Sequence, residues 1–548
     1  MALTDEQLIT AGIETGLLDS DIVEMLRKQN RRERHILLAK VLAYYRIPLS
    51  ALDRAVAQQQ GIPFINLAEA TVNVTLTKKM PSSLISRKLM LVVTYQGGDY
   101  LLVSEPGDIA AAHSAERLIG DSLPLAMAEL EQVRIAVKKV LASSAAAQSD
   151  AATPRPQTDL VALLDRVLKD AYLSRVSDIH LLTEEQGLRV RFRVDGRLTD
   201  YPLDVEADAA NGLISRVKVL SSLDIAEQRM PQDGGFTYKL APPINQEFNI
   251  RVATAPTRLG ERITMRLLGD DSSTLTLTDI GFLEGDLIAF KKAIKNPYGM
   301  ILLTGPTGSG KSTTLCAALQ EINRPDLNIM TVENPIEYVI EGVSQIQTGP
   351  KINFADALRS LLRHDPDVLM VGEIRDNETA DVAVKAAMTG HLVLSTLHTN
   401  NAVSAVTRLI DIGCEPFLIG STMTAVIAQR LVRRLCRHCA QPRLTTEDEM
   451  LLLDIDEPET IYESVGCAVC QGQGFRGRLG LFETLWFNEK LARLVAKGAD
   501  EETIESHAGS ALKFMWEDGC DKVLRGLTTL DEVRNVAVFK RHEKVEVS

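Results

Sequence analysis

The stretch GPTGSGKS, from Gly305 to Ser312, constrains the fold of this chain more than any other feature. It follows MILLTG, an apolar run of strand length, and it precedes a helical pattern. Its spacing matches G-x-x-x-x-G-K-[ST], a loop that holds phosphates. Glycines let the backbone N–H groups point inward, and the helix N-terminus favours an anion. Because strand, loop and helix occur together, a chance glycine turn is the weaker explanation, and we predict a nucleotide site.

Each residue of this loop has an expected part in binding ATP with magnesium. Lys311 would place a compact cation on the β- and γ-phosphates, and Ser312 would offer its hydroxyl to Mg²⁺. Thr313 can support the α-phosphate side. The predicted nucleotide-binding residues of the loop are Gly305, Pro306, Thr307, Gly308, Ser309, Gly310, Lys311, Ser312 and Thr313.

Hydrolysis also needs a carboxylate that orients the attacking water. Glu373 follows the apolar run 367–372, which places it at the carboxyl end of a predicted strand, where ligands bind in parallel sheets. Gly372 precedes it where a magnesium-binding aspartate is usual. We expect Glu373 to be the catalytic base or to position the water. The alternative is a surface carboxylate paired with Arg375.

Two further polar groups follow apolar runs. Glu333 and Glu337 lie four residues apart after NIMTV, and carboxylates there could hold the water shell of Mg²⁺. A loop of solvated acids explains them equally well. His398 follows HLVLST and could sense the γ-phosphate through a hydrogen bond. A core or capping histidine is the ordinary interpretation of such a residue.

Four of the seven cysteines form two C-x-x-C pairs: Cys436 with Cys439, and Cys467 with Cys470. In a chain without a visible signal peptide, such pairs favour metal ligands over disulfides. Four thiolates fit a closed tetrahedral Zn²⁺ site, which is structural and not catalytic. The 27 residues between the pairs predict an elaborated loop. Four independent buried thiols are the alternative.

The chain has 548 residues, too many for one core. Residues 1–62 show a helical period, whereas 63–142 mix strand-like runs with helices and predict a small α+β region. We expect a strand at 63–67 and a hairpin turn at Gly97-Gly98. The Ala-, Ser- and Pro-rich stretch 143–157 is typical of a linker.

The rest of the chain shows two different sequence patterns. Residues 158–270 alternate in the manner of antiparallel strands with flanking helices, which predicts an α+β domain. Residues 271–548 run strand–helix–strand–helix, typical of an α/β domain with a mostly parallel sheet. The zinc insertion would occupy about 430–475.

The net charge of −13 argues against nucleic acid as the main partner. One basic cluster exists, and a solvated or partner-facing surface is its ordinary explanation: Arg430, Arg433, Arg434 and Arg437. No apolar run is long enough to span a bilayer, and the N-terminus lacks the pattern of a signal peptide. We therefore expect a cytoplasmic protein that reaches a membrane only through partners.

Residues 158–540 resemble the secretion ATPases that drive type II secretion and type IV pilus assembly. The resemblance is carried by VSDIH (176–180), RFRVDGRL (191–198), DIAEQRMPQDG (224–234), RVATAPTRLGERITMRLL (251–268), PYGMILLTGPTGSGKSTT (297–314), TVENPIEY (331–338), DPDVLMVGEIRD (365–376), TGHLVLSTLHTNNA (389–402), the four cysteines and GFRGRLGLFE (474–483). It implies a RecA-like ATPase domain preceded by a PAS-like α+β domain.

The resemblance also implies roles for single residues. TVENPIEY is similar to the family's Asp box, which makes Glu333 and Glu337 magnesium or water-network ligands. STLHTN is similar to its His box, which gives His398 a place in the site. Glu373 matches the catalytic glutamate of the family's atypical Walker B motif. Arg251 and Arg266 match the arginines that the 158–270 domain presents to nucleotide, where a planar fork suits phosphoryl charge.

Further implications concern the assembly. The family forms homohexamers that use ATP, Mg²⁺ and Zn²⁺ and act on an inner-membrane platform protein, through motion between domains 158–270 and 271–548. The cysteines and the long N-terminal region argue against a retraction motor. Asn334 stands where the Asp box usually has aspartate, so a weakly hydrolysing regulator is the alternative.

The N-terminal region resembles the family's first domain only in outline. Some members bind cyclic di-GMP there through two motifs that open with Arg-Leu-Gly. Here Gln7-Leu8-Ile9 and Ile36-Leu37-Leu38 occupy those places, and Tyr45 stands at a glycine position. We expect no tight binding of cyclic di-GMP, and expect the region to dock onto a membrane-bound partner.

Overall fold

The computed structural model describes residues 3–29, 36–145, 159–185, 187–203, 207–242, 244–268 and 276–540. The chain divides into two compact units. The first comprises Met1–Gly269, Cys436–Ala440 and Ser464–Phe475, and the second comprises Asp270–Leu435, Gln441–Glu463 and Arg476–Ser548. The cysteine segments thus group with the N-terminal unit. No helix in the described ranges is both long and apolar enough to cross a membrane.

The first unit begins with a helical region, as the sequence period predicts. Its helices are α1 (Asp5–Glu14), α2 (Ser20–Gln29), α3 (Leu37–Tyr45) and α4 (Leu49–Gln59). The side chain of Thr4 caps α1 by accepting a hydrogen bond from the Gln7 amide. Leu8, Val41 and Leu52 lie in the apolar core that holds the helices together.

A small α+β region follows. Its sheet has the order β1 (Thr71–Val72), β2 (Leu91–Tyr95), β3 (Gly98–Leu102) and β4 (Leu125–Ala126), and its helices are α5 (Val74–Thr77), α6 (Ser82–Arg87), α7 (Ile109–Ile119) and α8 (Leu130–Ala145). The expected strand at 63–67 is wrong, because only Phe64 forms an isolated bridge, to Met127. The hairpin turns one residue earlier than expected, at Gln96-Gly97, where both φ angles are positive. Beyond Ala145 the predicted linker lies outside the described residues.

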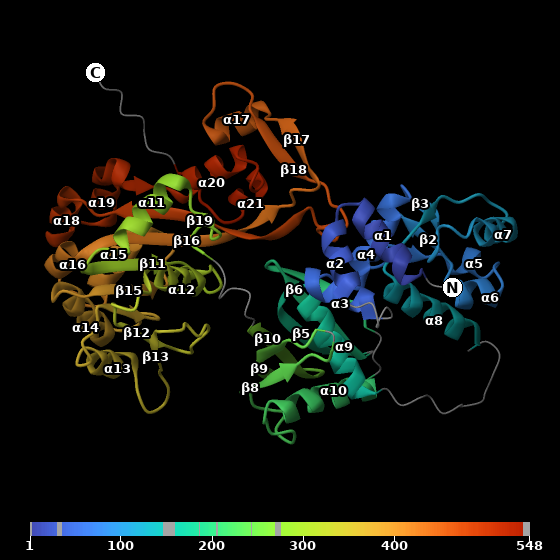
Figure 1. Cartoon of the computed structure of the whole chain (residues 1–548), viewed down its shortest axis with the longest axis horizontal. Helices are drawn as coiled ribbons and strands as arrows, with labels where there is room; N and C mark the ends of the chain where they lie inside the picture. The colour runs from blue at the N-terminus through green and yellow to red at the C-terminus, as the bar shows by residue number, and fades with distance from the viewer. Residues whose placement is uncertain are drawn as a thin grey trace. The chain divides into compact units, whose positions relative to one another are not determined.

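The next part of the chain, from α9 to β10, contains a six-stranded sheet in which neighbouring strands are antiparallel. The strands run β7–β6–β5–β10–β9–β8, with bounds β5 Val176–Glu184, β6 Gly187–Val194, β7 Arg197–Tyr201, β8 Gln232–Lys239, β9 Glu247–Thr257 and β10 Gly260–Leu268. Helices α9 (Leu160–Leu173) and α10 (Ala207–Leu220) lie against this sheet (Figure 1). Apolar and polar side chains alternate along the strands, so one face of the sheet is apolar and packs on the helices, and the other face is polar.

A buried ion pair joins α10 to this sheet. The Nζ of Lys218 lies 2.9 Å from each carboxylate oxygen of Glu261, and the two side chains are 1% and 5% exposed. We expect Lys218→Ala to destabilise this domain by about 3–5 kcal/mol, because Glu261 would keep a buried charge without a partner. Hydrogen exchange of the β10 amides in the full chain measures the effect. Arg258→Ala, in an exposed pair with Glu185, should change little, and equal exchange in the two variants would contradict the prediction.

The second unit is built on an eight-stranded sheet in the order β13–β12–β14–β15–β11–β16–β19–β20. Its strands are β11 (Gly299–Thr304), β12 (Ile329–Glu333), β13 (Ser344–Gln347), β14 (Val368–Val371), β15 (Leu392–Leu397), β16 (Met423–Leu435), β19 (Phe475–Trp486) and β20 (Leu512–Lys513). The strands from β13 to β16 pair in parallel, whereas β19 and β20 pair antiparallel. The carboxyl ends of the parallel strands therefore share one edge.

Helices cover both faces of this sheet. Met300 and Leu302 of β11 enter one apolar core, and Ile301 and Leu303 enter the other. The helices are α11 (Glu284–Ala293), α12 (Lys311–Ile322), α13 (Phe354–Leu361), α14 (Asn377–Met388), α15 (Ala402–Asp411), α16 (Pro416–Thr422), α18 (Glu489–Ala496), α19 (Glu501–Ala508), α20 (Met515–Leu524) and α21 (Leu530–Arg534). The loop between the cysteine pairs contains β17 (Ala440–Leu444), α17 (Glu447–Leu453) and β18 (Thr460–Ser464), so it is elaborated as expected.

Candidate nucleotide and metal sites

The glycine-rich loop connects β11 to α12, as its sequence context predicts. Gly305, Gly308 and Gly310 have φ angles of 143°, 80° and 88°, a region that favours glycine. Strand β16 forms a wall of the loop. A Cβ on Gly305 would lie 2.4 Å from the carbonyl oxygen of Gln429, and one on Gly310 would lie 2.8 Å from its Nε2. Larger residues would therefore push the loop away from β16.

The loop has the features that a phosphate group would satisfy. Gly310 is the N-cap of α12 and has no side chain with which to cap the first N–H groups of the helix. The hydroxyl of Ser309 is buried and has no hydrogen-bond partner among the described residues. Lys311 Nζ donates to the carbonyl oxygens of Gly305 and Pro306, at 2.7 and 3.1 Å, and so lies within the loop. These residues fit the phosphates of a nucleotide.

Burial lowers the pKa of Lys311 to about 8, although the charge of Glu373 opposes the shift. Below pH 8 the lysine is already charged when ATP arrives. Above pH 8 ATP binding must take up a proton, so we expect affinity to fall by up to about tenfold per pH unit between pH 8 and 10. Titration with a fluorescent ATP analogue measures this slope. Constant affinity across that range would contradict the prediction, and Lys311→Arg, which stays charged, should abolish the slope.

Glu373 lies immediately beyond β14 at the carboxyl edge. The amide of Ile374 donates to the carbonyl of Thr396, at 3.0 Å, which ties this segment to β15. The Glu373 carboxylate accepts from Arg375 at 2.7 Å and lies 3.4 Å from His398 Nε2. The pair with Arg375 therefore exists, but Glu373 is only 12% exposed while Arg375 is 68% exposed. A mostly buried carboxylate beside a histidine is not an ordinary surface acid.

His398 follows β15 and is held beside the phosphate loop. The amide of Thr399 donates to the hydroxyl of Thr304, the last residue of β11, at 2.9 Å. Because β14, β15 and β11 are neighbours, the sheet brings together Glu373, His398 and Lys311. His398 is 47% exposed, so it is not a core histidine.

The acidic pair of the loop after β12 has one ordered and one exposed member. The carboxylate of Glu333 accepts from the hydroxyl of Thr331 at 2.7 Å and from Gln345 Nε2 at 2.8 Å. These hydrogen bonds fix the orientation of the Glu333 side chain, which belongs to the last residue of β12. Glu337 and Asn334 are exposed. Glu333 can therefore act as a fixed acceptor for a magnesium water shell, and Glu337 as a solvated one.

Arg251 and Arg266 lie directly opposite each other on β9 and β10. The guanidinium of Arg266 donates through Nε to the carboxylate of Asp178, at 2.9 Å. Both arginines belong to the first unit, whereas the phosphate loop belongs to the second. The fold thus brings the two arginines together as a pair.

The four paired cysteines converge on one point, with their Sγ atoms all within 4.8 Å of one another. The Sγ–Sγ distance is 3.8 Å for Cys436–Cys467, 3.7 Å for Cys439–Cys470 and 3.8 Å for Cys467–Cys470. Tetrahedral zinc with bonds of about 2.3 Å would hold sulfur atoms about 3.8 Å apart. The amides of Cys467 and Gly474 donate to the Cys470 sulfur, which suits a thiolate. The residues therefore fit a structural zinc ion.

With this geometry established, comparison with known proteins is direct. The family model described as type II/IV secretion system protein matches residues 155–535. The chain belongs to this family. Type II secretion system protein E of Pseudomonas aeruginosa is 40% identical over 486 residues, covering 84% of this chain and 96% of that protein. Type IV pilus assembly ATPase PilB of Myxococcus xanthus is 38% identical over 516 residues, covering 88% and 90% respectively.

A solved structure supports the fold of this secretion family. The ATPase DotB of Legionella pneumophila aligns with 70% of this chain and 97% of its own, with 23% identity and a TM-score of 0.52, a likeness in fold alone. The expected family, the RecA-like α/β fold class and the ATP-hydrolysing enzyme class are confirmed.

For this member of the secretion family we expect about one zinc ion per chain. Replacing Cys436 and Cys439 together with serine should remove it, because two of the four ligands are lost. Cys520→Ser, at a buried cysteine outside the cluster, should keep the metal. Elemental analysis of the purified proteins measures the content. Retention of zinc by the double variant would rule out the four-cysteine site.

Sequence patterns missed several residues that shape the nucleotide site. Gln429 walls the phosphate loop and accepts a hydrogen bond from Thr314 at 2.8 Å. Its only sequence signal is that a polar residue follows the apolar run 425–428. Gln345 orients Glu333, and Thr399 ties the histidine loop to β11. Nothing in the local sequence of these two distinguishes them from ordinary polar residues.

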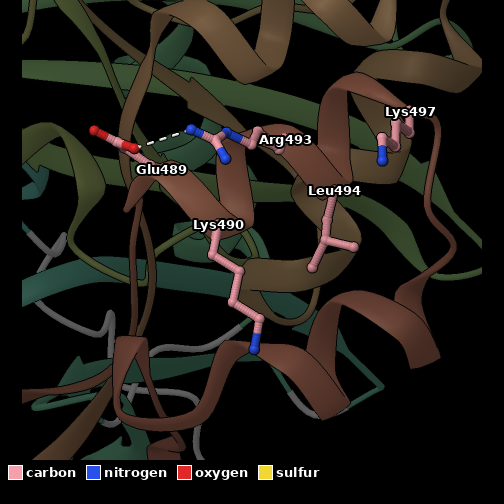
Figure 2. A pocket seen from close by; sticks show the side chains of 5 residues that line it. All are labelled: Glu489, Lys490, Arg493, Leu494 and Lys497. Carbon is pink, nitrogen blue, oxygen red and sulfur yellow. Dashed lines mark hydrogen bonds and ion pairs between the residues drawn. The ribbon is translucent and has the colours of Figure 1, made fainter.

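A separate hollow lies on α18 and is lined by charged and aliphatic side chains (Figure 2). Arg493 and Glu489 pair across it at 3.2 Å, and Figure 2 shows Lys490, Leu494 and Lys497 completing it. None of the residues discussed for nucleotide or metal lines this hollow. It is a shallow surface feature of one helix and its end, and it contributes nothing to the nucleotide site.

Proposed function

We propose that this chain is a motor that hydrolyses ATP as a homohexamer to power type IV pilus assembly or type II secretion. The observation that carries the proposal is the meeting of Lys311, Glu373 and His398 at the ends of three neighbouring parallel strands. A cation for the phosphates and a carboxylate for the water are groups that phosphoryl transfer to water uses, and His398 lies 3.4 Å from that carboxylate. A binding-only site would not require the carboxylate.

In this proposal each group of residues has a role. The loop from Gly305 to Thr313 binds the triphosphate, with Ser312 on Mg²⁺. Glu373 orients the attacking water and His398 senses the γ-phosphate. Glu333 and Glu337 order the magnesium water shell. Arg251 and Arg266 come from the first unit and neutralise charge that develops on the phosphoryl group.

The proposed partners follow from the family. The chain would act in the cytoplasm, at the inner membrane, on a platform protein of a pilus or type II secretion system. The helical region would dock the motor to a membrane-bound protein. Zn²⁺ would hold the cysteine segments. Tight binding of cyclic di-GMP is not part of this function, since Leu8, Ile9 and Leu37 are buried within the helical core.

A weakly hydrolysing regulator of the same machinery is the second candidate, and Asn334 is the residue that favours it. Two measurements separate the candidates. Native mass spectrometry with Mg²⁺ and a slowly hydrolysed ATP analogue should show a hexamer of the 60.1 kDa chain. Steady-state turnover should then depend on Glu373, whereas a regulator would show the same low rate with or without it.

A further inference from the structure

The two cysteine segments pack against a helix that lies nearly four hundred residues earlier in the sequence. They share one apolar core with α4, and its members include Leu52, Val56, Cys436, Ala468, Val469 and Cys470. The amide of Ala468 donates to the side-chain oxygen of Gln58, at 3.3 Å. Ala468 and Val469 lie between the two ligands of one C-x-x-C turn, so the turn itself presents the apolar surface.

Arg54 is the charged residue at this contact. Its guanidinium lies 4.3 Å from the centre of the Phe64 ring. The same guanidinium packs against Gly472, because a Cβ added to that glycine would lie 2.4 Å from Arg54 Nη1. A Zn²⁺ ion with four thiolates carries two net negative charges, and a half-buried arginine beside it offsets part of that charge.

We infer that the zinc-loaded cysteine turns are the docking surface for the first helical region, residues 3–29 and 36–59, with Arg54 neutralising the loaded site. Cys467 and Cys470 would hold the metal, and this would fix the turn 467–470 in the shape that places Val469 in the helical core. Without it, the four thiols and the backbone amides that donate to sulfur would lose the geometry on which that contact depends. The site would therefore join two parts of the chain, beyond holding its own loop together.

The first test removes the metal. Hydrogen exchange of the full chain is compared between wild type and the Cys436→Ser, Cys439→Ser double variant. We expect exchange of the α4 amides to accelerate by about tenfold or more, while α7, in a separate core, stays protected. Unchanged protection of α4 in a zinc-free protein would overturn the inference. Should the double variant lose protection throughout the chain, the second test decides.

The second test keeps all four cysteines. Arg54→Ala should retain about one zinc ion per chain but release it to a colorimetric chelator about 10- to 100-fold faster, because the charge of the site loses its neighbour. Arg54→Lys should recover part of the difference. Arg27→Ala is the matched control, since Arg27 lies in the same helical region and pairs with Glu6 and Glu24. Release from Arg54→Ala at the wild-type rate would overturn the inference. Neither readout depends on ATP hydrolysis.

Discussion

Glu373→Gln is expected to lower steady-state ATP hydrolysis by at least about 100-fold, the lower end of what a positioned general base contributes. Glutamine keeps the size of the side chain and its hydrogen-bonding oxygen, but it cannot accept a proton from water. ATP binding should persist, because the phosphate loop and Lys311 are unchanged. The effect should therefore appear in kcat and leave the equilibrium affinity for nucleotide intact.

The control for this experiment is Glu378→Gln. Glu378 lies five residues further along, in α14, and forms an exposed pair with Arg359 at 2.7 Å. The same chemical change there should leave turnover near the wild-type rate. Phosphate release gives the rate, and a fluorescent nucleotide gives the affinity. Equal turnover in wild type and Glu373→Gln would contradict the motor function and favour the weakly hydrolysing regulator.

Arg266→Ala should reduce kcat by about a thousandfold or more, within the range known for arginines that neutralise a transferring phosphoryl group. The pair with Asp178 aims the guanidinium, so Asp178→Asn should give a smaller loss in the same direction. Arg251, directly opposite on β9, should behave like Arg266. Because this charge is needed most in the transition state, nucleotide affinity should change far less than turnover.

Arg258→Ala, on the turn between the same two strands, controls for loss of positive charge from the domain, since its pair with Glu185 is exposed. Rates at saturating and limiting ATP separate kcat from KM. A rise in KM with unchanged kcat would show that Arg266 binds the ground state only, which would contradict its proposed role. Unchanged kinetics in both Arg251→Ala and Arg266→Ala would show that these arginines of the first unit take no part in hydrolysis.

Local pattern was enough to predict much of the second unit. The runs that became β11, β12, β14 and β15 are short and apolar, as strands buried on both faces must be. The run before Glu373 also predicted its position after the carboxyl end of a strand, and the part of Glu373 in hydrolysis stays a prediction. For His398 and Glu333 the residues alone left the outcome open, and the family resemblance supplied the expectation.

The rest depends on contacts between distant segments, which period and propensity do not encode. Gln429 meets Thr314 across 115 positions, and Ala468 meets Gln58 across 410. The short run 63–67 looks like a strand, yet in the structure it forms only an isolated bridge, with Met127 as its partner. In each case tertiary packing determines which residue is the contact partner, and the local sequence does not predict that residue.

Strand β16 has a mechanical consequence. It continues without interruption from Gln429, at the wall of the phosphate loop, to Leu435, the residue before the first zinc ligand. At about 3.3 Å per residue, the six steps from Gln429 to Leu435 span about 20 Å of extended backbone. Because the backbone is continuous, we expect a pull on Cys436 to reach the wall of the phosphate loop through this strand and to change the affinity for nucleotide.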